Sequence, residues 1–474
     1  MSSVTAISYT GNPIEIPQTA IEELGSRLRG PLLLTGEEGY EQSRSVWNAM
    51  IDRRPALIVR CLGTADVVAC VRFARSHDLA VSIKGGGHSI AGLAVCDGGM
   101  MLDMSLMRGV WVDPSTRTAH AQAGCLLADV DRETQLHGLA AVLGFVSNTG
   151  IAGLTLGGGF GYLTRRFGWT SDNVRSMNLV TADGELLEAS EREHPDLFWG
   201  LRGGGGNFGV VTNIQYALHD IGPEIVGGAI AWRADEGPRV LETFRTMMAG
   251  APPEVTCVAA LRKAPPAPWL DKAVHGQSVV VLFVCHSGPA EEGEAWTAPL
   301  KRLGSPVGDI LQRRSYLSQQ SLIDATQPAG HRYYWKSEYL PGHEPAMLDK
   351  ALAHAQKIVS PHSAILIFPL DGPLNRVPGE HSAVGNREAA SVTNIAAAWD
   401  SAEDDEANIG WARETWQDIR PFSTGGVYVN FLTDEETDDR TRAAYGDANF
   451  ARLAQLKRKW DPDNFFRRNK NVAP

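Results

Sequence analysis

The chain contains little cysteine and places none of it in the patterns that bind metals or build disulfide frameworks. Its six cysteines are spread over 474 residues without a C-x-x-C pair. Because zinc sites and small disulfide-stapled domains need closely spaced cysteines, neither is expected, and no metal site is predicted. We predict reduced, mostly buried thiols at these positions, which are Cys61, Cys70, Cys96, Cys125, Cys257 and Cys285.

Excess positive charge and long apolar runs are scarce as well. The formal charge of -11 at pH 7 and the scattered Lys and Arg residues leave no basic stripe for a phosphate backbone, so nucleic acid is not an expected partner. No stretch approaches the roughly 18 consecutive apolar residues of a membrane span. The first residues also lack the basic-then-apolar pattern of a signal peptide. We therefore expect a cytoplasmic protein without a membrane partner.

Two common nucleotide-binding motifs are missing. No G-x-G-x-x-G opens a helix with an acidic residue about 20 residues later, and no glycine loop is followed by Gly-Lys-Ser/Thr. These absences disfavour a nicotinamide enzyme of the Rossmann type and exclude a Walker motif. A phosphate-bearing ligand would then be held by successive backbone N–H groups in nest-like turns. Lys84, beside the first glycine loop, fits such a site.

The pattern of strands and helices predicts two domains. A chain of 474 residues is too long for one ordinary core. From residue 56 to about 220, short β-branched strands alternate with helices, including a helix over 64–75 that Thr64 would cap. Beyond about 222, apolar strands alternate with long helices. The predicted strands there cover 227–232, 278–285, 364–370 and 425–431, and a helix is predicted over 443–460.

Three glycine-rich loops fall within the first predicted domain, at residues 85–89, 150–161 and 202–209. The first directly follows a strand over 80–84 and contains His88. Glycine allows a sharp turn and lets a ligand approach the backbone. One such cluster fits a tight hairpin equally well, and a single histidine is commonly a buried structural residue. Three clusters, one of them with an adjacent histidine, favour a binding site.

The ordered series of motifs resembles a known family. These motifs are VSIKGGGHS at 81–89, the glycine segment 150–161, GWTSDN at 168–173, DLFWGLRGGGGNFG at 196–209, YVNF at 428–431 and WDPDNF at 460–465. The series resembles the berberine bridge enzyme-like oxidoreductases of the vanillyl-alcohol oxidase type. The pattern is nearest to the monocovalent members that resemble 6-hydroxy-D-nicotine oxidase.

The resemblance implies an α+β fold of the two-domain, PCMH-type FAD-binding class. An FAD-binding domain would cover residues 1–222, with its PCMH-type part at about 50–220. A substrate domain over 223–424 would be built on an antiparallel sheet covered by helices. The C-terminal segment 425–474 would return to the FAD domain.

The resemblance also implies FAD attached covalently through His88. In relatives with a second link, a cysteine lies eleven residues ahead of the G-G-G, and that position holds Val146 here, so one covalent link is expected. An imidazole link raises the redox potential of the flavin. The further residues implied at the cofactor are Lys84, Gly85, Gly86, Gly87, Ser89, Gly92, Thr149, Gly150, Gly153, Leu154, Gly157, Gly158, Gly159, Gly161, Asn207, Gly209, Val210, Val211, Tyr428 and Asn430.

The catalytic base departs from the family pattern, because Phe431 stands where plant members carry a tyrosine. The segment 333–339 resembles the family strand that faces the flavin, and Lys336 is our preferred proton-handling residue, with a lowered pKa. A solvated strand lysine is the alternative interpretation. Alternation places Tyr334, Lys336 and Glu338 on one face. Tyr334, Glu338 and Tyr428 are the alternative bases for an alcohol substrate.

These features predict an FAD-dependent oxidase. It would take hydride from a C–N or C–OH group of a small molecule to flavin N5 and pass the electrons to oxygen, giving hydrogen peroxide. Small, β-branched Thr149 lies where relatives open or close an oxygen pocket, which favours an oxidase over a dehydrogenase. A neutral amine needs no base. A sugar or secondary-alcohol oxidase, and a non-redox binding or isomerising protein, are the alternatives, and we expect a monomer or homodimer.

Overall fold

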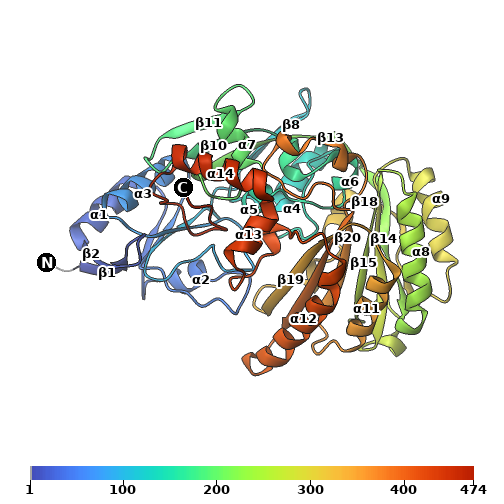
Figure 1. The fold of residues 1–474 in the computed structure, drawn as a ribbon. Coiled ribbons are helices and arrows are strands. Elements are labelled where there is room, and N and C mark those ends of the chain that lie inside the picture. Colours follow the sequence, from blue (N-terminus) through green and yellow to red (C-terminus); the bar gives the residue numbers. More distant parts are fainter. Residues whose placement is uncertain (1–2) are drawn as a thin grey trace.

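The computed structural model describes residues 3–474, and the chain forms three main sheets (Figure 1). Near the N-terminus lies a sheet of four strands in the order β3-β4-β6-β5, in which β6 is parallel to both β4 and β5. The hairpin β1–β2 and helices α1, α2 and α3 accompany it. The bounds are β1 Ser3–Ile7, β2 Pro13–Pro17, α1 Gln18–Arg27, β3 Leu32–Leu34, α2 Tyr40–Arg44, β4 Leu57–Arg60, α3 Thr64–Ser76, β5 Val81–Lys84 and β6 Met100–Asp103.

The second sheet is antiparallel, in the order β11-β10-β12-β8-β7. Its strands are β7 Val110–Asp113, β8 Thr118–Gln122, β10 Val174–Val180, β11 Leu186–Ser190 and β12 Val210–Ala217. The helices of this region are α4 Leu127–Thr134, α5 Ile151–Leu156, α6 Thr164–Phe167 and α7 Pro195–Leu201. A short pair joins β9 (Leu139–Ala140) to β13 (His219–Asp220).

The third sheet is the largest, and its strand order is β17-β14-β16-β15-β20-β21-β19, with β18 also paired to β14. All of its pairs are antiparallel. The strands are β14 Glu224–Arg233, β15 Val255–Lys263, β16 Ser278–His286, β17 Gly308–Asp309, β18 Gln312–Ser315, β19 Arg332–Leu340, β20 Ala364–Pro369 and β21 Ser391–Trp399. The helices of this part are α8 Gly237–Ala249, α9 Ala290–Lys301, α10 Tyr316–Gln320, α11 Pro345–Gln356 and α12 Asp405–Ile419.

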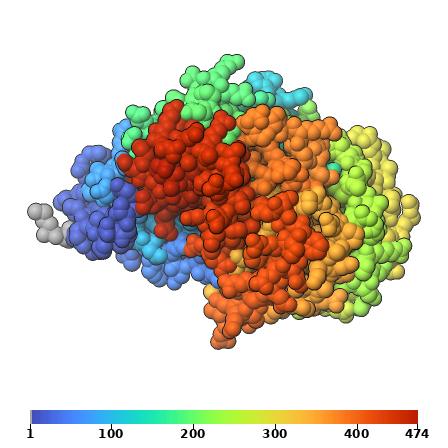
Figure 2. Space-filling model, viewed as in Figure 1, coloured from blue at the N-terminus to red at the C-terminus, as the bar shows by residue number. Residues whose placement is uncertain are grey.

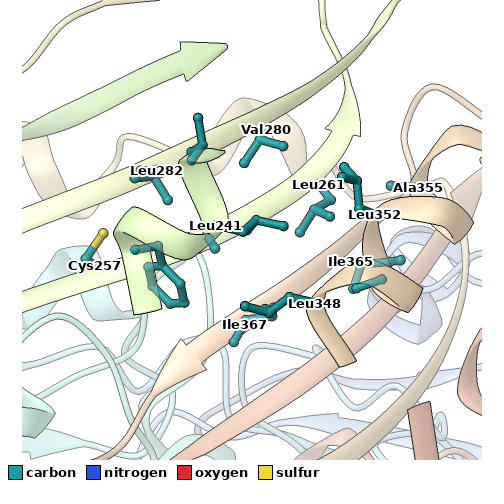
Figure 3. Packing of buried hydrophobic residues seen from close by; sticks show 14 of the residues in the cluster. Leu241, Cys257, Leu261, Val280, Leu282, Leu348, Leu352, Ala355, Ile365 and Ile367 are labelled. Atoms are coloured by element: carbon teal, nitrogen blue, oxygen red, sulfur yellow. The ribbon is translucent and has the colours of Figure 1, made fainter. Parts of the chain in front are cut away.

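One face of the large sheet is buried beneath helices. Leu241 of α8 and Leu348 of α11 pack with Leu261, Val280 and Ile365 from the strands (Figure 3). Burying an aliphatic side chain of this size stabilises the fold by about 1.5–3 kcal/mol. Because side chains alternate along a strand, this burial leaves every second residue for the opposite face. The sheet covered by helices confirms the expected α+β architecture.

The C-terminal residues return to the N-terminal half of the chain. Helices α13 (Asp438–Tyr445) and α14 (Asp447–Trp460) lie between the N-terminal part and the large sheet (Figures 1 and 2). Lys457 of α14 anchors this region, because its Nζ donates to the carbonyl of Asn207 at 2.7 Å and to Asp461 Oδ2 at 2.7 Å. The return of the segment brings the third glycine loop into contact with residues about 250 positions later.

Three local predictions differ from the structure. Gly63, not Thr64, precedes α3 as its cap, while the carboxylate of Asp66 accepts from the Leu62 N–H at 2.8 Å. The predicted strand over 425–431 is an irregular segment with a 3-10 turn at Val429–Phe431. The single helix predicted over 443–460 is two helices, because Gly446 adopts a left-handed φ of 76° between α13 and α14.

The structure also bears on the state of the cysteines and on the expected lack of membrane spans. All six cysteines are buried and free, as predicted. Among residues 3–474, none of the helices has both the length and the apolar character needed to cross a bilayer.

Candidate functional site

A cavity of about 370 Å³ is lined by the glycine loops, by the large sheet and by the C-terminal segment. The first glycine loop follows β5, the second leads into α5, and the third precedes β12. Residues of β19, β20 and β21 contribute the opposite wall. The cavity therefore lies where segments from all parts of the sequence meet.

The first two glycine loops are pressed against each other. A Cβ on Gly86 would lie 2.3 Å from the nitrogen of Gly150, so neither loop has room for a side chain there. Gly87 adopts a φ of 72°, which turns the chain into His88. By contrast, a Cβ on Gly153 would meet no atom within 4 Å, and this residue lines the cavity. The loops thus form a backbone-walled cradle that fits a flat, phosphate-bearing cofactor.

His88 faces this cavity as a neutral imidazole. Burial lowers the pKa of His88 to about 4, although a hydrogen bond with the Asn148 backbone opposes the shift. Its ring stacks on Trp47, with centroids 5.1 Å apart and planes 16° apart. Trp47 stacks in turn on Tyr333 of β19 at 3.6 Å. An oriented, uncharged histidine keeps a nitrogen lone pair available for a covalent bond.

Trp47 was missed by sequence reasoning, because its segment contains no recognisable motif. Its indole Nε1 donates to the carbonyl of Gln327 at 3.1 Å, a residue 280 positions later. A local sequence pattern cannot predict a contact between residues so far apart in the chain.

Most residues predicted at the cofactor line the cavity. They are Gly85, Gly86, Gly87, His88, Ser89, Thr149, Gly150, Gly153, Leu154, Gly157, Gly209, Val210, Val211, Tyr428 and Asn430. The predicted residues that do not line it are Lys84, Gly92, Gly158, Gly159, Gly161 and Asn207.

The glycines outside the cavity serve packing instead. A Cβ on Gly159 would lie 2.5 Å from the hydroxyl of Thr170, and one on Gly161 would lie 1.9 Å from the Leu143 carbonyl. Gly158 has a φ of 105°, which L side chains rarely adopt. Gly92, with a φ of 67°, has the side chain of Ile51 at 2.6 Å from its Cβ position. Positive φ values and close neighbouring atoms, and not contact with the cavity, require glycine at these four positions.

The two polar residues outside the cavity are already occupied by protein groups. Lys84 Nζ donates to the carbonyl of Ser43 at 2.6 Å, and the residue does not line the cavity. The amide of Asn207 donates to the Gly204 carbonyl at 2.8 Å and accepts from the Val472 N–H at 3.0 Å. Asn207 therefore connects the third glycine loop to the end of the chain.

Tyr428 and Asn430 join the C-terminal segment to the second glycine loop. The Tyr428 hydroxyl accepts from the Gly159 N–H at 3.0 Å and from Asn430 Nδ2 at 2.9 Å. Asn430 Nδ2 also lies 3.3 Å from the carbonyl oxygens of Gly153 and Leu154. Burial raises the pKa of Tyr428 far above its ordinary value. This tyrosine is accordingly a neutral phenol that positions the backbone, and it does not fit the predicted role of a base.

Lys336 and Tyr334 point away from the cavity, contrary to the prediction. Trp335 lines the cavity, so its neighbours on β19 face the helix-covered side. Lys336 Nζ pairs with Glu435 at 2.7 Å and with Glu436 at 2.6 Å. The Tyr334 hydroxyl hydrogen-bonds to Glu435 as well.

The same contacts reverse the expected pKa shift of Lys336. Burial alone would lower the pKa of this amine, but hydrogen bonds to Glu435 and Glu436 raise it above its usual value. Glu338 also faces this side, where its Oε1 accepts from Trp416 Nε1 at 2.7 Å. We conclude that this row of residues forms an ionic and hydrogen-bonded cluster beside α12.

The wall formed by the large sheet is apolar except for one amide. Besides Trp335 and Asn394, it carries Leu366, Phe368 and Ala396. Phe145, Phe160 and Phe431 extend the apolar surface. Phe431 was predicted near the flavin, but the other residues of this wall were not. Strand alternation groups residues by face and does not say which face meets a cavity.

Positive charge lies at the C-terminal rim of the cavity, contributed by Arg468 and Lys470. Lys470 Nζ donates to the carbonyl of Thr433 at 2.6 Å, and burial lowers its pKa to about 8. Neither cation was predicted, although the basic run at 467–470 was a usable signal.

Comparisons with known proteins identify the family of the chain. Residues 55–190 match the family described as "FAD binding domain", and residues 427–473 match the one described as "Berberine and berberine like". An FAD-linked oxidoreductase of Dictyostelium discoideum is 30% identical over 461 residues, which cover 96% of this chain and 97% of the relative. The (R)-6-hydroxynicotine oxidase of Paenarthrobacter nicotinovorans is 30% identical over 477 residues, covering 95% and 99%.

Solved structures agree with these matches. The crystal structure of 6-hydroxy-D-nicotine oxidase from Arthrobacter nicotinovorans superposes with a TM-score of 0.84 at 28% identity, covering 94% of this chain and 98% of that one. A chitooligosaccharide oxidase superposes equally well, with a TM-score of 0.84 at 22% identity and coverage of 96% and 99%, which shows a shared fold.

Proposed function

Because this chain belongs to the berberine bridge enzyme-like family of FAD-linked oxidoreductases, we propose that it is an oxidase of small amines that holds FAD through one covalent bond to His88. When bound, FAD accepts a hydride equivalent from a C–H group beside nitrogen and returns the electrons to oxygen, giving hydrogen peroxide. The protein's residues bind the cofactor, orient both reactants and exclude water.

The covalent part of the proposal is supported by His88 and its surroundings. The imidazole is neutral, lies at the cavity and is held by the Trp47 stack. Val146 lines the same cavity, and no cysteine does so within the described residues. His88 is therefore the residue available for a single tether. Arg468 and Lys470 supply the positive charge that would stabilise the bound diphosphate.

Acid precipitation tests this part. Flavin should stay with the denatured wild-type protein, and it should enter the supernatant for His88→Ala, whose glycine loops still bind FAD noncovalently. His137→Ala, a change of an exposed histidine outside the cavity, is the matched control and should retain its flavin. Release of all flavin from fully loaded wild-type protein would rule out the covalent bond.

The amine part rests on one observation, namely that the substrate-facing wall carries no group suited to be a base. Its side chains are Trp335, Leu366, Phe368, Asn394, Ala396 and Phe431. Tyr428 and Tyr445 are the phenols that line the cavity in the described part of the chain, and burial raises the pKa of both, which keeps them protonated. Alcohol oxidation requires removal of the hydroxyl proton, whereas a neutral amine can lose hydride without a base. The related (R)-6-hydroxynicotine oxidase is consistent with an amine substrate.

A peroxide-release screen with matched pairs tests this part. Cyclic and benzylic amines should release peroxide, with a rate that rises with pH as the free amine becomes neutral. The corresponding alcohols should not react. A preference for alcohols or sugars would instead favour a carbohydrate oxidase, the activity of the chitooligosaccharide oxidase that shares this fold. Slow reoxidation of the reduced enzyme by air would indicate a dehydrogenase.

We also propose the domain division 1–222, 223–424 and 425–474. The large sheet has its own buried cluster, which supports the division at 222. Residues of 425–474 pack into the clusters of the four-stranded and five-stranded sheets, which supports a segment that returns to the FAD domain. Limited proteolysis should cut near residues 222 and 424 before it cuts within a cluster.

A further inference from the structure

The ends of three neighbouring strands bring two histidines and a carboxylate together outside the cavity. In the large sheet β21 lies between β20 and β19 and runs antiparallel to both. His331 immediately precedes β19, His362 lies just before β20, and Asp400 immediately follows β21. Because the end of β21 lies beside the starts of both neighbours, the pairing itself assembles the three side chains.

The spacing of the three groups matches a single coordination sphere. His331 Nδ1 lies 3.4 Å from Asp400 Oδ1, and His362 Nε2 lies 3.4 Å from Asp400 Oδ2. The candidate ligand atoms of all three residues are within 4.8 Å of one another. Two ligands that each lie about 2.1 Å from one ion at a tetrahedral angle are about 3.4 Å apart. No large movement is needed to bind a metal.

Hydrogen bonds hold the strand ends that carry the two histidines, and His331 lacks a competing partner. His331 Nδ1 is buried and makes no hydrogen bond within residues 3–474. The His331 carbonyl accepts from the Ala49 N–H at 2.8 Å. Next to His362, the Ser363 hydroxyl accepts from the Ala398 N–H of β21 at 3.1 Å.

We propose that His331, His362 and Asp400 bind one divalent transition-metal ion of the Zn²⁺ class, with the remaining coordination position open to water. Imidazole suits zinc, nickel and copper, and a carboxylate completes the set. The side chain of Asp400 is 71% exposed, so an ion can enter from solvent. A bound ion would connect the ends of β19, β20 and β21 and would stabilise the folded state.

Equilibrium dialysis of the untagged, metal-free holoenzyme against Zn²⁺ tests the site. We expect about one ion per chain, and His362→Ala should bind at least about tenfold more weakly. Asp400→Asn, a change at an exposed position, should also weaken binding and guards against a folding defect in the first variant. His137→Ala is the matched control for the loss of a histidine and should bind like wild type.

Thermal unfolding provides a second measurement on the same proteins. Zn²⁺ should raise the melting temperature of wild type and of His137→Ala but not of His362→Ala. Equal binding by wild type and both ligand variants, or no stabilisation of wild type by Zn²⁺, would overturn the proposal. Neither measurement depends on turnover, so the result is independent of the amine oxidase proposal.

A second, independent observation concerns the apolar wall of the cavity. Asn394 of β21 is only 2% exposed, and its Oδ1 has no hydrogen-bond partner in the described part of the chain. Its neighbours across the sheet are Leu366 and Ser337, and the Ser337 hydroxyl is also unpartnered. Of this polar pair only Asn394 lines the cavity. A buried carboxamide oxygen without a partner has lost its hydrogen bond to water, and a ligand that supplies a donor would restore that hydrogen bond.

We also infer that Asn394 determines specificity by accepting a hydrogen bond from the substrate. This inference rests on the proposed function, because the wall must face the substrate. The aromatic side chains around Asn394 fit a flat, apolar ring, and Oδ1 fits one N–H or O–H donor on that ring. The substrate class is thus an aromatic or similarly apolar molecule with a single ring-borne donor.

Phenol and toluene are matched probes of this contact, because they have nearly the same shape but only phenol can donate. Binding is measured as a change in flavin absorbance of the holoenzyme. Wild type should prefer phenol by about tenfold, and Asn394→Leu should lose that preference while it still binds toluene. Ser337→Ala, on the same face but outside the cavity, should keep the preference.

A phenol preference that persists in Asn394→Leu, or its absence from wild type, would overturn the inference. The readout is binding and not peroxide release. Failure of the amine screen with an intact phenol preference would therefore count against the proposed reaction alone.

Discussion

The imidazole of His88 and the indole of Trp47 lie in a stack, with ring centroids 5.1 Å apart and an interplanar angle of 16°. Trp47 also stacks on Tyr333 of β19, with ring centroids 3.6 Å apart. One tryptophan thus connects the histidine of the first glycine loop to the large sheet. The orientation of His88 depends on a ring that no sequence motif identifies.

Replacing this tryptophan should impair both stability and flavin attachment. Trp47→Ala removes a side chain that is 4% exposed, so we expect the free energy of unfolding to fall by about 3–5 kcal/mol. We also expect less covalent flavin, because His88 loses the surface that orients it. Denaturant unfolding and acid-precipitated flavin measure the two effects.

Two further variants make that result specific. Trp47→Phe keeps a ring in the stack and should retain most of the covalent flavin. Trp111→Ala, at a position that is 62% exposed, should change neither quantity. Normal covalent flavin in Trp47→Ala would show that the stack does not orient His88.

A methyl group at Gly86 should separate the first two glycine loops. The added Cβ would lie 2.3 Å from Gly150 N and 2.6 Å from Gly150 Cα, and backbone atoms cannot move aside without shifting the loop. We expect Gly86→Ala to lose bound FAD and to melt at a lower temperature. The ratio of flavin to protein absorbance and thermal unfolding are the measurements.

Gly25→Ala is the matched control, because a Cβ at that helical position meets no atom within 4 Å. It should bind FAD normally and gain up to about 1 kcal/mol of stability. Full FAD occupancy in Gly86→Ala would contradict the close packing of the loops.

Removing the charge of Lys336 should affect stability but not turnover. Lys336→Met leaves Glu435 and Glu436 without their shared cation, which should cost about 1–3 kcal/mol. Because the amine points away from the cavity, kcat should stay within about twofold of wild type. Lys350→Met, at a position whose side chain is 51% exposed, should alter neither stability nor kcat. A large loss of kcat in Lys336→Met with normal flavin content would restore the lysine as a catalytic residue.

The same variant should respond differently to acid. Burial would raise the pKa of Glu435, but hydrogen bonds from Lys336, Tyr334 and Arg413 bring it down to about 2. A carboxyl with a depressed pKa stabilises the fold above its ordinary pKa of 4.5, and this stability is lost as the pH falls toward 2. We expect wild type to lose more stability than Lys336→Met between pH 5 and pH 3, as measured by urea unfolding.

Asp131 should destabilise the protein at neutral and alkaline pH. Burial raises its pKa to about 7, despite a hydrogen bond from Gln320 Nε2 at 3.0 Å. Between the ordinary pKa of 3.8 and about 7 the unfolded chain releases a proton that the folded chain retains, so stability falls as the pH rises. Asp131→Asn removes this penalty and should stabilise the protein by several kcal/mol at pH 8. The gain should be much smaller at pH 4.5.

Melting temperatures at the two pH values test this expectation. Asp349→Asn, at an exposed position of α11, should shift both values equally and only slightly. A gain for Asp131→Asn that is the same at pH 4.5 and pH 8 would mean that the carboxyl does not have a raised pKa.

The cofactor side of this protein could be predicted from local sequence alone. The glycine loops and His88 are local motifs, because a turn through consecutive glycines depends on the conformational freedom of those residues and little else. The order of these motifs along the chain indicated the family, and with it the α+β fold. Most of the loop residues line the cavity. Local sequence did not separate Gly157, which lines the cavity, from Gly161, which packs against the Leu143 carbonyl.

The face of β19 that meets the cavity could not be predicted from local sequence, because it depends on tertiary packing. Alternation groups Lys336 with Tyr334 and Trp335 with Ser337, but the choice between the two faces depends on which one the helices cover. Burial beneath α12 and ion pairs with Glu435 and Glu436 hold Lys336 on the face of the sheet away from the cavity. Trp335, on the other face, then lies at the cavity. Likewise, the His88–Trp47 stack and the group of His331, His362 and Asp400 join residues from distant segments. Such contacts arise from sheet pairing and packing over long sequence separations, which no local pattern contains.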